Sequence, residues 1–228
     1  MKRKFLTVFL LCTFTLIHAN ASALNFNFPN FFSISVFSEK TKASIYCDIE
    51  EHWCKNSAER LYNEKIFTGM KIGNNYYFMP DEYITRGEFL LYLNAVLKLP
   101  FEDNITLPFS DVFSIPKWQI PTVCTMYKNG FINGNIEKGA LFFNYDEKIS
   151  RLECAIILNN MLELTTSVYS TDYYDNYLIP AYAVTAVKNV TDYGLMQGYQ
   201  DNSFRPYIKI TRAMLADILC KVKDYNEK

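Results

Sequence analysis

Two kinds of apolar segment recur along the chain and predict helices. Over residues 53–65, apolar side chains at Ala58, Leu61 and Tyr62 have the three-to-four-residue spacing of one helix face. A second kind of apolar segment follows a loop in each of three places, at residues 89–97, 155–162 and 215–222. The two kinds of segment alternate along the chain, so the pattern favours a mainly α protein in which short helices occur in pairs.

These segments belong to an internal repeat. Three loop glycines are spaced 65 and 64 residues apart, at Gly69, Gly134 and Gly198. An aromatic residue stands sixteen positions before each, at Trp53, Trp118 and Tyr182. A repeat of this length predicts three helix–loop–helix units, and since one pair of helices cannot bury its own apolar face, the units should pack on each other.

A second block repeats after the glycines. It places a Phe eight residues before an Arg that follows Ile-Thr or Ile-Ser, at Arg86, Arg151 and Arg212. Thr85, Ser150 and Thr211 are natural N-caps of the second helix of each unit. Glu88 and Glu153 complete capping boxes in the first two units, whereas the third has Met214.

The three arginines have no such local explanation, because a cation at a helix start opposes the helix dipole. One interpretation pairs each Arg with a carboxylate of its own or a neighbouring unit, with Asp48, Asp111 and Asp175 as candidates. The other gives each Arg an external anion, supported by free backbone N–H groups at the helix start. In the second case Arg→Ala should change folding little, and Arg86 and Arg151 rank first because their own units keep the Glu.

The whole pattern resembles the S-layer homology (SLH) domain. Phe-x-Asp, an aromatic residue, the glycine segment, Asp-x-x-Phe-x-Pro and Ile-Thr-Arg-Ala occur in the family order, most closely around residues 198–213. The resemblance covers about residues 44–224 and implies a pseudo-threefold assembly with a central three-helix bundle and three prongs. It also implies that grooves between the prongs bind a pyruvylated secondary cell-wall polymer. The second unit departs from the pattern, with Tyr145 in place of Pro and no Asp-Gly turn.

Carried over by position, the resemblance assigns a role to each repeated residue. Arg86, Arg151 and Arg212 would meet the ketal carboxylate of the glycan. Gly69, Gly134 and Gly198 would let backbone amides approach the sugar. Trp53, Trp118 and Tyr182 would be aromatic supports.

The N-terminus predicts export. Lys2, Arg3 and Lys4 precede an apolar run over residues 5–17, and Ala21-Ser22-Ala23 is typical of a signal-peptide cleavage site. After cleavage the chain has 20 Lys and Arg and 24 Asp and Glu, which gives a net charge of −4. The sequence has no basic stripe, so nucleic acid is not expected as a partner. No later segment is apolar enough to span a membrane.

Five cysteines and one histidine remain after cleavage, without a Cys-x-x-Cys pair. A metal site is therefore not expected, and no cofactor is implied. Several cysteines fall at apolar helical positions, although a Cys124–Cys154 disulfide remains an alternative. The sequence contains neither a Gly-x-Ser-x-Gly motif nor a P-loop, and caps, turns and solvated faces account for its carboxylates, so we do not expect an enzyme.

The sequence thus predicts a secreted protein at the cell wall or cell surface that binds wall polysaccharide without covalent linkage. An SLH-like surface adaptor that binds another surface protein, or itself, is the alternative. The predicted organisation is a signal peptide at 1–23, an arm or linker at 24–43, and repeats at 44–100, 107–164 and 171–224. Residues 24–28 alternate apolar and polar side chains like a strand. The sequence does not decide whether this segment is a linker or an arm docked on the repeats.

Overall fold

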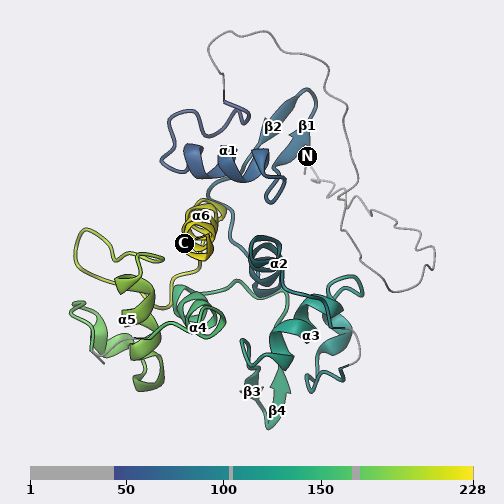
Figure 1. Cartoon of the computed structure of the whole chain (residues 1–228), viewed down its shortest axis with the longest axis vertical. Helices are drawn as coiled ribbons and strands as arrows, with labels where there is room; N and C mark the ends of the chain where they lie inside the picture. Colours follow the sequence, from purple (N-terminus) through teal and green to yellow (C-terminus); the bar gives the residue numbers. More distant parts are fainter. Residues whose placement is uncertain (1–43, 103–104, 166–169, 228) are drawn as a thin grey trace, which may run out of the picture. The chain divides into compact units, whose positions relative to one another are not determined.

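A computed structural model describes residues 44–102, 105–165 and 170–227 (Figure 1). The described residues all belong to one compact unit, Ala43–Lys228. The predicted signal peptide (1–23) and the predicted arm (24–43) lie outside the described residues.

The described part is rich in helix, as the sequence predicts. Its elements in chain order are α1 (Lys55–Asn63), β1 (Met70–Ile72), β2 (Asn75–Tyr77), α2 (Arg86–Leu97), η1 (Val112–Ser114), α3 (Ile120–Lys128), β3 (Asn135–Glu137), β4 (Ala140–Phe142), α4 (Arg151–Met161), η2 (Asn176–Leu178), η3 (Ala181–Ala183), α5 (Val184–Asp192) and α6 (Arg212–Asn226). Within these residues, no helix has the length and hydrophobicity needed to cross a bilayer.

The second helix of each repeat begins at the motif arginine. Thr85 and Ser150 cap α2 and α4, and both capping boxes are complete, with the glutamate side chain accepting from the cap backbone. The hydroxyl of Thr211 accepts from the Met214 amide, so α6 has only half of the box. The predicted N-caps and both boxes are therefore confirmed.

The first helix of each repeat ends at a residue in the left-handed region. Gly130 (φ 71°) and Gly194 (φ 72°) hold this position, as predicted, and Lys65 (φ 59°) holds it in the first repeat. Pro121 lies in the first turn of α3. Pro180 differs from the prediction, because the chain first makes the short η3 turn and only then enters α5.

Two small hairpins occupy loops that we expected to be irregular. β1 pairs antiparallel with β2, and β3 with β4, each over three residues. Gly73 (φ 62°) stands in the first turn, and Lys138 and Gly139 (φ 50° and 81°) form the second. Positive φ at one or both central residues is typical of the tight turns that join such strands, so Gly73-Asn74 and Lys138-Gly139 were a readable signal.

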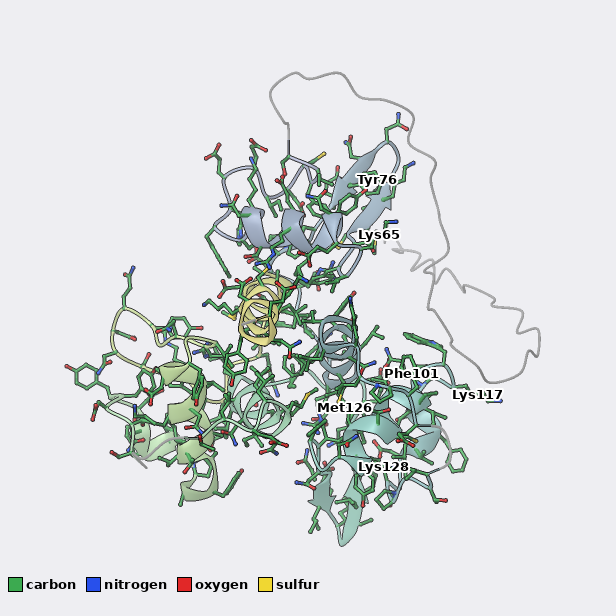
Figure 2. All side chains as sticks on the ribbon, viewed as in Figure 1. Lys65, Tyr76, Phe101, Lys117, Met126 and Lys128 are labelled. Atoms are coloured by element: carbon green, nitrogen blue, oxygen red, sulfur yellow. The ribbon has the colours of Figure 1, made fainter. Side chains whose placement is uncertain are left out.

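The helices pack across repeats. α1 packs against α6, α3 against α2, and α5 against α4. The first helix of each repeat thus covers the second helix of the preceding repeat, with repeat 1 following repeat 3. Met126 of α3, fully buried, lies on the side facing α2, whereas Lys128 is exposed (Figure 2). The units therefore pack on each other as the sequence predicts, and the first helix of each repeat buries its apolar face on another repeat.

Three backbone hydrogen bonds link the starts of α2, α4 and α6, which Figure 1 views nearly along their axes. The Ile84 amide donates to the Ile210 carbonyl (3.1 Å), Ile149 to Ile84 (3.0 Å) and Ile210 to Ile149 (3.0 Å). The bonds close a ring in which each repeat donates once and accepts once. All three isoleucine side chains are buried, so this ring lies in the core.

Four of the five described cysteines are buried packing residues, at Cys54, Cys124, Cys154 and Cys220. Cys124 and Cys154 are both buried and no disulfide joins them, which decides against the alternative from the sequence. Burial raises the pKa of the Cys154 thiol well above its ordinary value. A small apolar side chain suits these positions.

Candidate functional site

Each motif arginine reaches into the next repeat. The Nε of Arg86 donates to the carbonyl oxygen of Phe143 (2.9 Å), that of Arg151 to Phe204 (2.8 Å) and that of Arg212 to Phe78 (2.7 Å). The accepting residue is the repeated Phe in every case. Each guanidinium also lies over the ring of that Phe, at 5.3, 4.6 and 5.2 Å from the centroid. The arginines therefore hold neighbouring repeats together.

The backbone amides at the helix starts are occupied as well. The amides of Arg86 and Gly87 donate to carbonyls of repeat 2, at Glu147 and Tyr145. The first two amides of α4 and α6 do the same to the neighbouring repeat, with Ile208, Pro206, Glu82 and Pro80 as acceptors. The third amide goes to the cap hydroxyl. An external anion could not use free N–H groups there, so that part of the anion interpretation is wrong.

The three candidate aspartates do not pair with the arginines. Asp48 accepts from the amides of Phe78 and Met79 (2.8 and 2.7 Å). Asp111 and Asp175 accept in the same way from the amides at 143 and 144 and at 204 and 205. Each carboxylate fixes the loop before the second helix of its own repeat. The expected Asp–Arg pairing is therefore incorrect, and the Asp of the Phe-x-Asp motif is structural.

One arginine has a carboxylate partner from a neighbouring repeat. Arg86 Nη1 lies 2.7 Å from Glu153 Oε1, and their side chains are 6% and 27% exposed. Burial raises the pKa of Glu153, but the charge of Arg86 and bonds from Ser150 outweigh it, so the pKa lies below its ordinary value. The capping glutamate of one repeat thus faces the arginine of the preceding one. This removes the basis for ranking Arg86 and Arg151 by the Glu of their own repeats.

The other two arginines bond to carbonyl oxygens. Arg151 Nη2 donates to Gln197 (2.7 Å), and burial lowers the pKa of this guanidinium. Arg212, half-buried, donates weakly to Thr68 (3.5 Å). Burial raises the pKa of Tyr92 above its ordinary value, and the positive charge of Arg212 partly offsets this rise.

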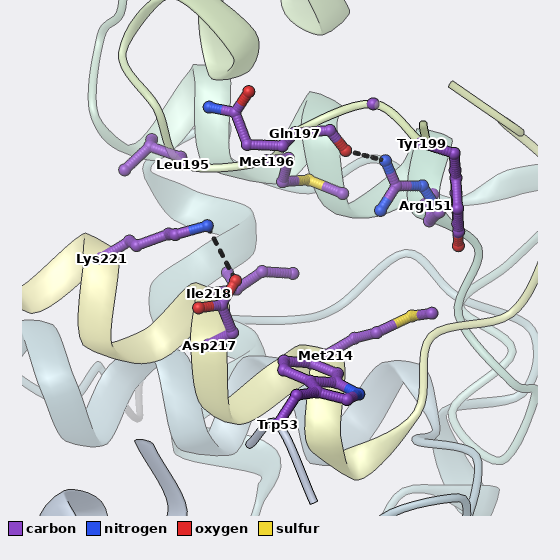
Figure 3. A pocket seen from close by; sticks show the side chains of 11 residues that line it. Trp53, Arg151, Leu195, Met196, Gln197, Tyr199, Met214, Asp217, Ile218 and Lys221 are labelled. Atoms are coloured by element: carbon purple, nitrogen blue, oxygen red, sulfur yellow. Dashed lines mark hydrogen bonds and ion pairs between the residues drawn. The ribbon is translucent and has the colours of Figure 1, made fainter. Parts of the chain in front are cut away.

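A groove opens beside Arg151 (Figure 3). Its cavity of about 200 Å³ draws on all three repeats: Arg151 from repeat 2, Trp53 from repeat 1, and the loop and α6 of repeat 3. We call this the Arg151 groove, and its lining is Trp53, Arg151, Leu195, Met196, Gln197, Gly198, Tyr199, Met214, Asp217, Ile218 and Lys221. Asp217 and Lys221 form an ion pair inside it (2.8 Å).

A second groove has the same plan one repeat earlier. We call it the Arg86 groove; it has a cavity of about 290 Å³ and combines Arg86, the loop at Gly134, α4 with Glu153, and Tyr182 of repeat 3. Both cavities are smaller than the roughly 300–1,000 Å³ of drug-sized ligand sites.

The predicted glycines line these grooves but are also needed inside the fold. Gly134 and Gly198 belong to the two linings. A Cβ on Gly198 would meet the Tyr173 ring at 2.3 Å, and one on Gly69 would meet Tyr46 at the same distance. The packing of the repeat therefore requires glycine at these positions. Among the described residues, the Gly134 and Gly198 amides have no hydrogen-bond partner, so both can face a ligand.

The repeated aromatic residues are exposed. Trp53, Trp118 and Tyr182 are 61%, 62% and 78% exposed, so all three stand at the surface. Trp53 lines the Arg151 groove and Tyr182 the Arg86 groove. The prediction from the sequence missed that Trp53 and Tyr182 line a groove with the arginine of another repeat, and it missed Tyr199, whose ring lies 5.1 Å from the Arg151 guanidinium.

Comparisons with known proteins identify the repeated module. The S-layer homology domain matches residues 46–90, 108–136 and 173–213. An amylopullulanase of Thermoanaerobacterium thermosulfurigenes is 26% identical over 209 residues, 89% of this chain and 10% of that protein. An endoglucanase of Bacillus sp. (strain KSM-635) is 25% identical over 195 residues, 82% of this chain and 19% of that protein. The chain therefore spans a small part of either relative.

Three matched segments in tandem, one within each predicted repeat, confirm that the chain carries three copies of the module. The chain belongs to the S-layer homology domain family, a family of modules that associate with the cell wall and bind its polymers.

Proposed function

We propose that this chain binds a wall polysaccharide bearing carboxylate groups, a pyruvylated secondary cell-wall polymer, and so anchors a secreted protein at the cell surface without covalent linkage. The observation that carries the proposal is the plan shared by two grooves. Each joins a guanidinium, a glycine loop with unpartnered amides and an exposed aromatic ring, each from a different repeat.

The three parts suit three features of such a sugar. Arg86, Arg151 and Arg212 offer planar donors to the ketal carboxylate. The amides of Gly134 and Gly198 supply donors to ring substituents, and Gly69 holds the same position in repeat 1. Trp53, Trp118 and Tyr182 offer flat apolar faces against which a sugar ring can pack.

The assembly that we propose is the pseudo-threefold one of the family, with α2, α4 and α6 as a central three-helix bundle and the remaining parts as three prongs. The ring of bonds among Ile84, Ile149 and Ile210 supports it. We also propose repeat boundaries at 44–100, 107–164 and 171–224, and cleavage of a signal peptide near Ala23. No catalytic role is proposed, since the groove side chains lack a paired acid and base.

Sedimentation with purified Gram-positive cell walls tests the proposal. The secreted chain should pellet with intact walls and stay in solution after the polysaccharide has been removed chemically. Arg151→Lys should weaken pelleting although the charge is kept, because Lys offers a point charge in place of a fork. Pelleting that is unchanged on stripped walls, or self-association in their absence, would instead favour a protein-binding surface adaptor.

A further inference from the structure

The two grooves differ in charge although their plan is the same. In the Arg86 groove the guanidinium already holds Glu153 (2.7 Å) before any ligand arrives. Glu153 also accepts from the amide and hydroxyl of Ser150, so it is fixed in place. An incoming carboxylate must displace this partner and is repelled by it.

The Arg151 groove has Met214 at the matching position. Thr211 accepts from the Met214 amide (3.4 Å), as Thr85 and Ser150 do from their glutamates, but the side chain is an uncharged thioether. Figure 3 shows Met214 and Arg151 lining the same cavity. The side-chain bonds of Arg151 all go to carbonyl oxygens, and no carboxylate of the described residues lies within ion-pair distance.

The remaining charges of this groove do not neutralise Arg151. Asp217 of the lining is paired with Lys221 (2.8 Å), and Asp175, which lies outside the lining, is held by two backbone amides. The Arg151 residue is only 6% exposed. A cation that is buried without a counter-ion is unfavourable, so a ligand carboxylate that supplies the missing charge gains the full interaction.

We propose that Met214, by leaving Arg151 without a carboxylate partner, makes the Arg151 groove take the carboxylate-bearing sugar ahead of the Arg86 groove. The inference rests on the proposed function and deepens it by assigning selectivity to one side chain. It also means that Met214 of repeat 3, at the position held by Glu in the other repeats, determines whether the arginine of repeat 2 has a carboxylate partner.

Two variants whose new side chains have equal length test the proposal, Met214→Glu and Met214→Gln. Both side chains can complete the capping box of α6, so both proteins should melt at or above the temperature of the wild type. Only Glu brings a charge to Arg151. Wall polysaccharide released from purified walls is titrated into the secreted chain, and the indole N–H signal of Trp53, which lines this groove, is followed by NMR.

Met214→Glu should bind at Trp53 at least about tenfold more weakly than Met214→Gln, the usual effect of losing one charge-assisted bond. In the reciprocal variant, Glu153→Gln keeps an acceptor for Ser150 and releases Arg86. Calorimetry should then detect a gain of about tenfold in affinity at a second site.

The outcomes separate the two proposals. If the wild type binds but Met214→Glu and Met214→Gln agree within twofold, the role of Met214 is wrong and wall binding stands. If the polysaccharide binds without moving the Trp53 signal, the ligand does not occupy the Arg151 groove and this inference is wrong. If the wild type binds no polysaccharide, the proposed function fails, and this inference with it.

Discussion

At the scale of single residues, the motif arginines have a structural task besides the proposed one. Their Nε atoms bond to backbone carbonyls of the next repeat, and Arg86 and Arg151 are buried. Arg86 additionally neutralises Glu153. A buried side chain with such bonds cannot be removed without leaving its partners unsatisfied.

Truncation of these arginines should therefore destabilise the fold, in contrast to the sequence-based expectation of little change. Arg86→Ala should cost about 3–5 kcal/mol because it strands a partly buried carboxylate. Arg212→Ala, at a half-buried site, should cost about 1–2 kcal/mol. Urea unfolding of the two variants measures the difference. Equal midpoints to the wild type would mean that the bonds contribute nothing to stability.

The Arg86–Glu153 pair should also make stability depend on pH. Folding lowers the pKa of Glu153 below its ordinary value of 4.5. The pair therefore stabilises the fold above that value, and its contribution is lost as the pH falls through the lower folded pKa. Between about pH 5 and 3 the free energy of unfolding should fall more steeply in the wild type than in Glu153→Gln. Parallel curves for the two proteins would contradict this assignment.

At the scale of elements, an aspartate fixes the entry to the second helix of each repeat. Asp111 accepts from the amides of Phe143 and Asn144 (2.8 and 2.7 Å), and Asn144 has a positive φ of 60°. Asp48 and Asp175 repeat this arrangement. The second amide that each accepts from belongs to Met79 and Arg205, whose φ values are 58° and 55°. One carboxylate thus holds a turn that the backbone alone disfavours.

Loss of this carboxylate should be costly. Asp111→Ala leaves two amides without an acceptor and should lower the free energy of unfolding by about 3 kcal/mol. Asp111→Asn keeps one acceptor and should cost about half as much. Asp146, an exposed residue of the same repeat, gives the matched control, since Asp146→Ala should change stability by less than about 0.5 kcal/mol. Thermal unfolding of the three variants compares them, and similar losses at 111 and 146 would refute the role of Asp111.

At the scale of the whole described unit, the repeats close on themselves. Each first helix packs on the preceding repeat, and the bonds of Ile84, Ile149 and Ile210 form a ring. In an open array, a repeat contacts only its neighbours and the ends can unfold separately. In a closed ring, every repeat has two partners and no end exists.

Unfolding should consequently be a single cooperative transition. Urea curves followed by far-UV circular dichroism and by tryptophan fluorescence, which reports Trp53 in repeat 1 and Trp118 in repeat 2, should coincide. Ile149→Ala in the ring should lower the free energy of unfolding by about 2–5 kcal/mol, and both probes should shift together. Separate midpoints for the two probes would mean that the repeats fold independently.

The sequence by itself determined the features that depend on near neighbours. The hydroxyls of Thr85 and Ser150 cap the helices that follow them, because a cap acts within one turn. Gly130 and Gly194 end helices for an equally local reason, their tolerance of positive φ. The recurrence of the motifs in the same order at a nearly constant period was enough to predict three repeats, since the period is a property of the chain alone.

Only the tertiary structure decided which repeat meets which. Arg86 contacts Glu153 across 67 positions and Arg212 contacts Phe78 across 134, and the repeat pattern is the same whether a side chain faces its own unit or the next. Because the motifs are alike, the sequence does not show which repeat each side chain contacts. The packing of each helix on another repeat decides which repeat each side chain contacts. The same packing places Met214 of repeat 3 in the groove of Arg151.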